Sequence, residues 1–380
     1  MIRTLNSIHD LDPNTWNEWV GRYPFLRHEF LAALEDSQAT CADTGWIPKH
    51  LVVLDSDQPV AALPVFEKHH SRGEYVFDWS WADAFERAGG HYYPKLLSAA
   101  PFTPATGPRF LGDPKFLPEL ESKLTQLLEH YSSWHGLFPT DSDPMTQLEG
   151  DFRFGIQYHW QNQGYQDFDQ FLAGMTSKRR KAIKRERRIV REQGIQLKRV
   201  LGCDCTAEQR AHFYHFYQQT YAVRGQRGYL NADTFERLFA HMGEQMLLTT
   251  ASLEQEIVGC ALLFFDDTHL YGRYWGGLGI DCLHFETCYY QGIEFAIERG
   301  LQVFDPGAQG EHKIPRGFEP VKTRSLHRIS HPEFAQAVRR FLAQEAQAID
   351  QWQIQAAESL PFKLNTELKA PGPRDTKNTP

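Results

Sequence analysis

The stretch from Leu270 to Ile329 constrains the fold more than any other part of this chain. An aromatic, apolar segment at 270–275 has the composition of a strand and runs into a cluster of glycines. A helical pattern follows over 283–299 and stops at Gly300, a residue that readily takes the left-handed cap conformation. A second strand, at 303–305, leads into a loop crowded with charged residues. This order predicts an α/β unit whose chemistry lies at element boundaries.

The rest of the chain mixes strands and helices in the same way. Strands are predicted at 50–54, 60–66, 74–81, 134–138, 158–161, 195–200 and 323–329, with a hairpin over 246–265. Helices are predicted at 117–131, 165–175, 177–193, 207–223, 232–242 and 332–355. The tail from residue 364 lacks apolar anchors and is predicted to be disordered. The predicted fold class is α/β of the α+β kind.

Two pairs of segments suggest an internal repeat. VAALPVF at 60–66 resembles VGCALLF at 258–264, and Tyr75-x-x-x-Trp79 matches Tyr271-x-x-x-Trp275 at a similar offset. The pattern indicates either duplication of one α/β unit or a chance likeness between two hairpins.

Composition limits the class of protein. A chain of 380 residues suggests roughly two to three domains, and its formal charge of −8 argues against a protein coated with nucleic acid. Six cysteines without CxxC spacing predict reduced thiols and a cytoplasmic location. We predict no signal peptide, no membrane span and no metal site, because the pairs His69-His70 and His212-x-x-His215 lack further ligands at the usual spacing.

The segment 177–193 is the most basic part of the chain, with nine Lys or Arg against two Glu. Several cations fall in its first turn, where the helix dipole disfavours them, so a bound anion such as phosphate or RNA would explain the placement. A simply solvated basic helix is the alternative. The glycines after the predicted strand would let a backbone approach phosphate closely, or form an ordinary turn. The predicted donor-binding residues are Lys178, Arg179, Arg180, Lys181, Lys184, Arg188, Gly276, Gly277 and Gly279.

Four residues are candidates for proton transfer. Glu286 lies at the edge of the core-facing stripe of the predicted helix, where burial would raise its pKa and suit a general base. Alternatively it complements the helix dipole. Glu311 and His312 stand in the charged loop, and His284 lies one turn before Cys288.

An aromatic, acidic segment in the first half is a candidate binding surface. Carboxylates among aromatic rings suit an amine or a planar group, although they also suit a core between domains. The predicted acceptor-binding residues are Asp78, Trp79, Trp81 and Asp83, with Tyr271, Arg273 and Tyr290 from the second half.

Several motifs in order resemble one family. FDWSWADAFERAGGHYYPKL, PFTPATGPRFL, SKRRKAIKRERR, YGRYWG, LHFETCYYQ and GAQGEHKIPRGFEP are similar to the FemAB-like predicted N-acyltransferases of the GNAT superfamily, also labelled peptidoglycan biosynthesis or recognition proteins. The resemblance implies two tandem GNAT-like units, each a mixed, mostly antiparallel sheet flanked by helices. The implied boundaries are 1–160, 161–335 with the basic helix, and a C-terminal helix at 336–363.

The resemblance also implies an activity. An acyl or aminoacyl group would pass from acyl-CoA or aminoacyl-tRNA, neither of them tightly bound, to a small-molecule or peptide amine. Tyr274 stands where the GNAT phosphate signature has a polar residue, so the donor stays open between CoA and tRNA. The rival hypothesis is a non-catalytic protein of the same fold that binds RNA or a cell-wall fragment.

Overall fold

The computed structural model describes residues 1–308 and 310–363, and the predicted disordered tail at 364–380 lies outside them. The helices are α1 (Pro13–Val20), α2 (His28–Asp36), α3 (Trp79–Arg87), α4 (Leu117–Leu127), α5 (Phe168–Ala173), α6 (Ser177–Glu192), α7 (Ala207–Ala222), α8 (Ala232–Met242), α9 (Leu283–Phe285), α10 (Gln291–Arg299) and α11 (Pro332–Glu358). None of the helices in these ranges is both long and apolar enough to cross a membrane.

The strands form two sheets. The first has four strands in the order β1 (Ile2–Leu5), β3 (His50–Asp55), β4 (Gln58–Leu63), β7 (Leu111–Gly112). The second has eleven, in the order β10 (Gln196–Leu201), β11 (Met246–Leu253), β12 (Glu256–Phe265), β13 (His269–Gly277), β14 (Val303–Asp305), β9 (Asp151–Gln161), β15 (Glu319–Ile329), β8 (Ser133–Leu137), β6 (Lys95–Ser98), β5 (Phe66–Lys68), β2 (Trp46–Pro48). The fold is therefore mixed α/β, built on one large mixed sheet.

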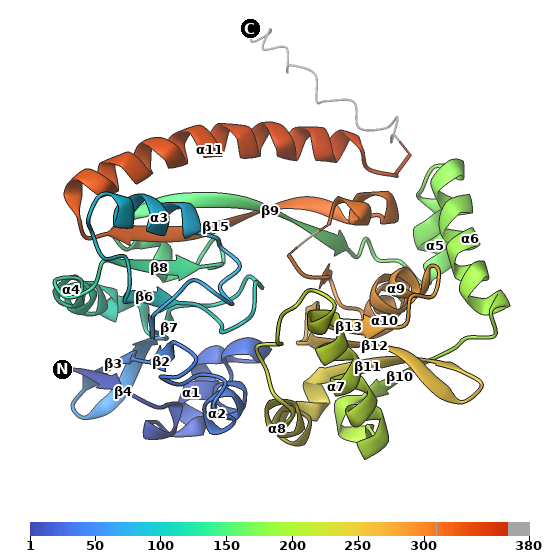
Figure 1. Ribbon diagram of the computed structural model, residues 1–380, viewed down its shortest axis with the longest axis horizontal. Coiled ribbons are helices and arrows are strands. Elements are labelled where there is room, and N and C mark those ends of the chain that lie inside the picture. Colours follow the sequence, from blue (N-terminus) through green and yellow to red (C-terminus); the bar gives the residue numbers. More distant parts are fainter. Residues whose placement is uncertain (309, 364–380) are drawn as a thin grey trace, which may run out of the picture.

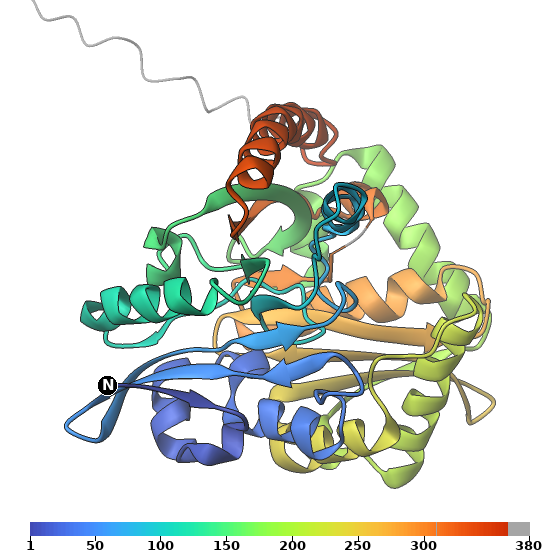
Figure 2. The ribbon, with the colours of Figure 1, turned by 60° about the vertical axis from the view of Figure 1, so that its left-hand side comes forward.

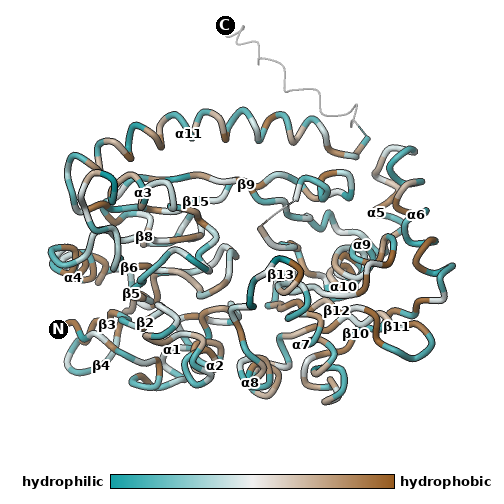
Figure 3. The backbone as a smooth tube through the Cα atoms, in the orientation of Figure 1, coloured by the Kyte–Doolittle hydropathy of each residue, from teal (hydrophilic) through white to brown (hydrophobic). Residues whose placement is uncertain are grey.

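Two long strands join the halves of the chain. β9 pairs with β14 from the second half, and β15 pairs with both β9 and β8. Helix α11 packs along this central pair, as Figure 1 shows. In Figure 2, α11 (red) and the first helices (blue) lie on opposite sides of the sheet. In Figure 3, hydrophilic (teal) and hydrophobic (brown) segments alternate along α11. This is expected for a helix that packs one face on a sheet.

Each half contains one pair of parallel strands. β6 and β8 are parallel with α4 between them in the chain, and β13 and β14 are parallel with the helix of 283–299 between them. Parallel neighbours require such a crossover, whereas the other paired strands in these sheets are antiparallel. The segment after β13 thus carries the chain back so that β14 runs beside β13 in the same direction.

The predicted strand at 74–81 is wrong. Tyr75 has a φ of 64°, and Trp79 begins the helix α3. Trp81 and Ala82 are buried on one side of this helix, so its apolar residues follow helical spacing rather than alternation. The Tyr75–Trp79 half of the suggested repeat therefore has no structural counterpart in the strand 271–275, although the β3–β4 and β11–β12 hairpins both form.

Candidate active site

The candidate site lies where β13 and β14 separate. The two strands pair only through 269–271 and 303–305, after which β13 continues to Gly277 without β14. A register shift between β12 and β13 leaves Arg273 without a partner residue across the strands, which is a β-bulge. Bulges re-aim side chains and are common beside active sites. The carboxyl ends of the two strands thus open a gap beneath the loop that follows Asp305.

Asp305 is the carboxylate at this gap. It is the last residue of β14, is buried, and accepts a hydrogen bond from the Gly307 N–H at 2.8 Å. His159 on the neighbouring strand β9 brings its Nε2 to 3.6 Å from Asp305 Oδ1, and the same nitrogen lies 3.1 Å from Gln157 Oε1. Burial lowers the pKa of His159 against the opposing pull of Asp305, so the imidazole is neutral at neutral pH.

Lys313 supplies a buried cation beside this pair. It lies in the short helical turn η8 (Glu311–Arg316), is only 1% exposed, and donates from Nζ to the Gly307 carbonyl at 2.6 Å. Burial lowers the pKa of Lys313 to about 8, and the charge of Asp305 opposes that shift. The ammonium is therefore mostly charged at neutral pH but close to its titration point.

Residues from the first half of the chain form the opposite wall of this gap. Arg273 Nη2 donates to the Phe102 carbonyl at 2.6 Å, and Gln157 Nε2 donates to the Pro104 carbonyl at 2.7 Å. A cavity of about 470 Å³ lies between the halves, lined by Asp305, His159 and Tyr271 on one side and by Tyr23 and residues 106–108 on the other. A cavity of this size, with an acid and a neutral imidazole in its lining, can hold an amine and a carbonyl.

Comparison with known proteins places the chain in a family. A model described as FemAB-like, peptidoglycan biosynthesis/recognition, matches residues 7–364. The chain belongs to the FemAB-like family. The predicted membership is therefore confirmed.

Two solved structures share the fold of the FemAB-like chain, and a third is less similar. The crystal structure of FemX matches with a TM-score of 0.53 at 11% identity, over 87% of this chain and 98% of that chain. A conserved protein of unknown function from Bacteroides thetaiotaomicron VPI-5482 matches with a TM-score of 0.50 at 11% identity, over 86% and 100%. A tandem GNAT protein from the clavulanic acid biosynthesis pathway has a TM-score of 0.40 at 9% identity, over 87% and 99%. No curated protein matches the sequence.

The FemAB-like chain brings only part of the predicted acceptor set to this gap. Tyr271 and Arg273 lie there. Asp78 is instead buried and bound by Lys95 Nζ at 2.5 Å, and Trp81 is buried beside it on α3. The remaining two first-half candidates, Trp79 and Asp83, are exposed on the outer side of α3.

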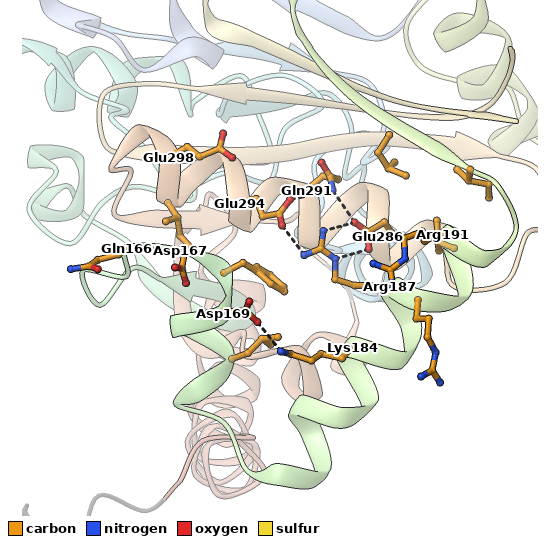
Figure 4. Close-up of a pocket in the computed structure, with 17 residues that line it drawn as sticks. Gln166, Asp167, Asp169, Lys184, Arg187, Arg191, Glu286, Gln291, Glu294 and Glu298 are labelled. Atoms are coloured by element: carbon orange, nitrogen blue, oxygen red, sulfur yellow. Dashed lines mark hydrogen bonds and ion pairs between the residues drawn. The ribbon is translucent and has the colours of Figure 1, made fainter.

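Glu286 lies in a different groove of the FemAB-like chain, between α5, α6 and α10 (Figure 4). Arg187 donates to both its carboxylate oxygens at 3.0 Å, and Gln291 Nε2 adds a bond of 2.8 Å. A carboxylate with both oxygens engaged is poorly placed to take a proton from a substrate. Arg187 also reaches Glu294 at 2.7 Å, so this network holds α6 against the helix.

Tyr290 also holds α6 in place. Its hydroxyl bonds Glu186 of α6, and Arg316 ties the pair together with bonds of 3.1 Å to Tyr290 and 2.7 Å to Glu186. The predicted continuous helix over 283–299 contains a widened π turn, η7 (Glu286–Tyr290), which rotates the side chains that follow it. The turn directs Glu286 and Tyr290 towards α6.

The helix start and the charged loop do meet, through histidines and aromatic rings. Tyr289 OH lies 2.8 Å from His312 Nε2, and the His284 ring centre is 6.0 Å from that of His312. Burial lowers the pKa of His284 to about 4, helped by the nearby His312 and Arg316, so His284 is neutral. Glu311 is exposed. Glu311 and His312 lie on the same short turn, η8, as Lys313.

We expect Glu286→Gln to affect stability more than turnover. Loss of a charged partner for Arg187 should lower the free energy of unfolding by about 1.5–3 kcal/mol, because bonds to charged groups contribute about that much. Denaturant unfolding and an acyl-transfer assay on the same preparation would measure both. Glu311→Gln, at an exposed position, is the control and should change neither. A hundredfold loss of turnover with unchanged stability would return Glu286 to the role of base.

The predicted basic helix forms as α6, and most of its basic side chains are exposed to solvent. Lys178, Lys181 and Arg188 are exposed, while Arg179 and Arg180 are half-buried. Lys184 and Arg188 line the groove of about 750 Å³ that also holds Glu286. Lys184 pairs with exposed Asp169 at 2.8 Å, a surface ion pair of small stabilising effect.

Close packing explains why β13 contains the glycines Gly276 and Gly277. A Cβ on Gly276 would lie 2.2 Å from the Phe216 carbonyl oxygen of α7, and one on Gly277 would lie 2.9 Å from Gly259 Cα. Both therefore allow close backbone approach inside the protein. Gly279, by contrast, has nothing within 4 Å of that position.

Alanine substitutions separate packing from phosphate binding. Gly276→Ala should force α7 away from β13 and lower the free energy of unfolding by about 1–3 kcal/mol, the usual cost of overpacking. Gly279→Ala should fold normally because the space is open. Thermal unfolding and donor affinity would be measured for both variants. If Gly279→Ala folds normally but loses donor affinity, the glycine run binds the donor after all.

Three residues at the gap were missed as site residues. From the sequence alone, Lys313 lies in the charged loop without a role of its own, and Asp305 and His159 lie in predicted strands. One signal was available: a lone Asp ending a short apolar strand, just before a glycine-rich loop. His159 carried none, because its strand is far away in sequence.

Proposed function

We propose that the protein is an acyltransferase that moves an acyl or aminoacyl group from a phosphate-bearing donor to an amine, at the gap between β13 and β14. The observation that carries the proposal is that Asp305 and His159 line the cavity of about 470 Å³, with buried Lys313 bonded to the Gly307 carbonyl two residues after Asp305. Membership in the FemAB-like family supports this class of reaction.

Each residue has a role in the proposed reaction. The amine nitrogen attacks the acyl carbonyl carbon, and the developing oxyanion is stabilised by the Lys313 ammonium. His159, neutral because of burial, takes the proton that the amine loses, and Asp305 stabilises the imidazolium. The carbon–sulfur or carbon–oxygen bond to the donor then breaks, and the proton passes to the leaving thiolate or alkoxide.

The donor side of the proposal rests on α6. The cations Lys178, Lys181 and Arg188, all exposed, offer a surface to the phosphates of acyl-CoA or aminoacyl-tRNA. The architecture that goes with this function is two tandem GNAT-like units, at 1–160 and 161–335, followed by a C-terminal segment at 336–363, although the helix there, α11, runs over Pro332–Glu358. The parallel strand pair in each half supports that division.

A transfer assay tests the proposal. Purified protein would be incubated with labelled acyl-CoA or with charged tRNA, together with a panel of amines, and N-acylated products would be measured by mass spectrometry. We expect product with one donor class and none without enzyme. Donor binding without product for every amine, and without donor hydrolysis, would favour the non-catalytic binding protein instead.

A further inference from the structure

A second cavity opens beside the proposed reaction site. It has a volume of about 260 Å³, and its lining shares Thr323 and Arg324 of β15 with the larger cavity. Gln157 lines the second cavity, and its Oε1 lies 3.1 Å from Nε2 of His159, which lines the first. The two cavities therefore meet at Thr323 and Arg324, and the Gln157–His159 contact joins a wall of one to the proposed base in the other.

The walls of the second cavity are mainly apolar. Segment 75–77 and Phe138 come from the first half, and Ile349 comes from α11. Arg153 also lines it, but its guanidinium is engaged by Glu345 in two bonds of 2.8 Å and by the Phe77 carbonyl at 2.7 Å. The other arginine in the lining, Arg324, pairs with Asp141 at 2.8 Å. A cavity with aromatic and aliphatic walls, whose two cations are already paired, favours an uncharged, apolar group.

The floor of this cavity is kept open by a glycine. Gly155 lies in the middle of β9, opposite Thr323 of β15. A Cβ built there would have only one neighbour within 4 Å, the Thr323 Oγ1 at 3.1 Å. Glycine inside a strand weakens it and often marks the close approach of a ligand. Among residues 1–308 and 310–363, no packing requires Gly155, so the open space is the remaining reason.

We infer that this cavity is a specificity subsite for an aromatic or similarly sized apolar group carried by the amine acceptor. The volume exceeds the roughly 150 Å³ of an engineered apolar cavity that holds benzene. The inference rests on the proposed function, since the amine is placed at His159. It adds that glycine-like amines are poor acceptors, because they leave the subsite empty.

Binding without a donor tests the subsite independently of catalysis. Phenylalaninamide and glycinamide differ by one benzyl group, and their dissociation constants would be measured by calorimetry. Native protein should bind phenylalaninamide about 10–100-fold more tightly, the factor expected for burying one aromatic side chain. Gly155→Val places a β-branched side chain on the floor and should remove most of this preference, with glycinamide binding unchanged.

A second variant fills the cavity from another wall. Ile349→Trp on α11 should have the same effect as Gly155→Val, and Ala348→Trp, at the neighbouring exposed position, should have none. Equal affinity for the two amines in the native protein would overturn the inference. So would loss of phenylacetyl-CoA binding in the filled variants with amine binding retained. Failure of acyl transfer alone would refute only the proposed function, because these measurements use no turnover.

Discussion

Lys313→Met is expected to reduce kcat/KM for acyl transfer by about 10²–10³, the cost of removing one oxyanion-stabilising group. Methionine keeps most of the volume of the aliphatic chain, so the buried turn η8 should persist. The bond from Nζ to Gly307 is lost, and the buried Asp305 carboxylate loses the charge of the nearby ammonium. Steady-state kinetics with the donor identified by the transfer assay would measure the change.

The pH dependence of the native enzyme checks the same role. Activity should fall as pH rises through about 8, where the Lys313 ammonium loses its proton. The folded pKa lies below the ordinary value of 10.5, so the unfolded chain binds more protons between these values and stability rises with pH there. Lys115→Met, at an exposed lysine, is the matched control and should keep native activity. Full activity in Lys313→Met would remove Lys313 from the mechanism.

Lys95→Met is expected to destabilise the fold by about 3–5 kcal/mol, the cost of breaking a buried ion pair from one side. Lys95 is fully buried, and its Nζ donates to Glu74 at 2.8 Å, to Asp78 at 2.5 Å and to Ser71 at 2.9 Å. Without the ammonium, two carboxylates remain in the core. Lys68 Nζ lies 3.9 Å from Glu74, and His135 lies 3.7 Å from Asp78 but is neutral, because burial lowers its pKa to about 3. Urea unfolding followed by circular dichroism would measure the loss.

The destabilisation by Lys95→Met should depend on pH. Burial already raises the pKa of Glu74 to about 7, and removal of Lys95 should raise it further. The variant should therefore recover stability at about pH 5, where protonation neutralises the orphaned carboxyl groups. Adding Glu74→Gln and Asp78→Asn should rescue the variant at neutral pH. A loss that is equal at both pH values would mean that packing, rather than charge, sets the effect.

The parts of the fold that could be predicted from sequence have local causes. Helix α8 begins and ends where predicted because Asn231 caps it and its apolar residues keep helical spacing. Helix α7 has a capping box between Thr206 and Gln209. The prediction of a strand at 74–81 was wrong because its aromatic residues are typical of strands. The burial of Glu74 and Asp78 around Lys95 is a long-range effect that the local sequence does not indicate.

The site was harder to predict than the fold. Tyr271 and Arg273 were identified because they lie in the diagnostic stretch around the glycines. Glu286 was chosen for its place on a helix, but its partner Arg187 comes from α6 and engages both its oxygens. The pairing of His159 with Asp305 depends on strand order, which no local pattern encodes. Donor-binding roles for α6 stay a prediction.

The pairing of β9 with β15 limits how this protein can be divided into independent domains. His159 is on β9, which precedes the second half in the chain, and its neighbours come from β14 and β15. β15 in turn completes the sheet of the first half through β8. The smallest segment that contains all the residues of the proposed reaction is thus nearly the whole chain. New specificities would have to arise by point changes in the cavity walls rather than by exchange of modules.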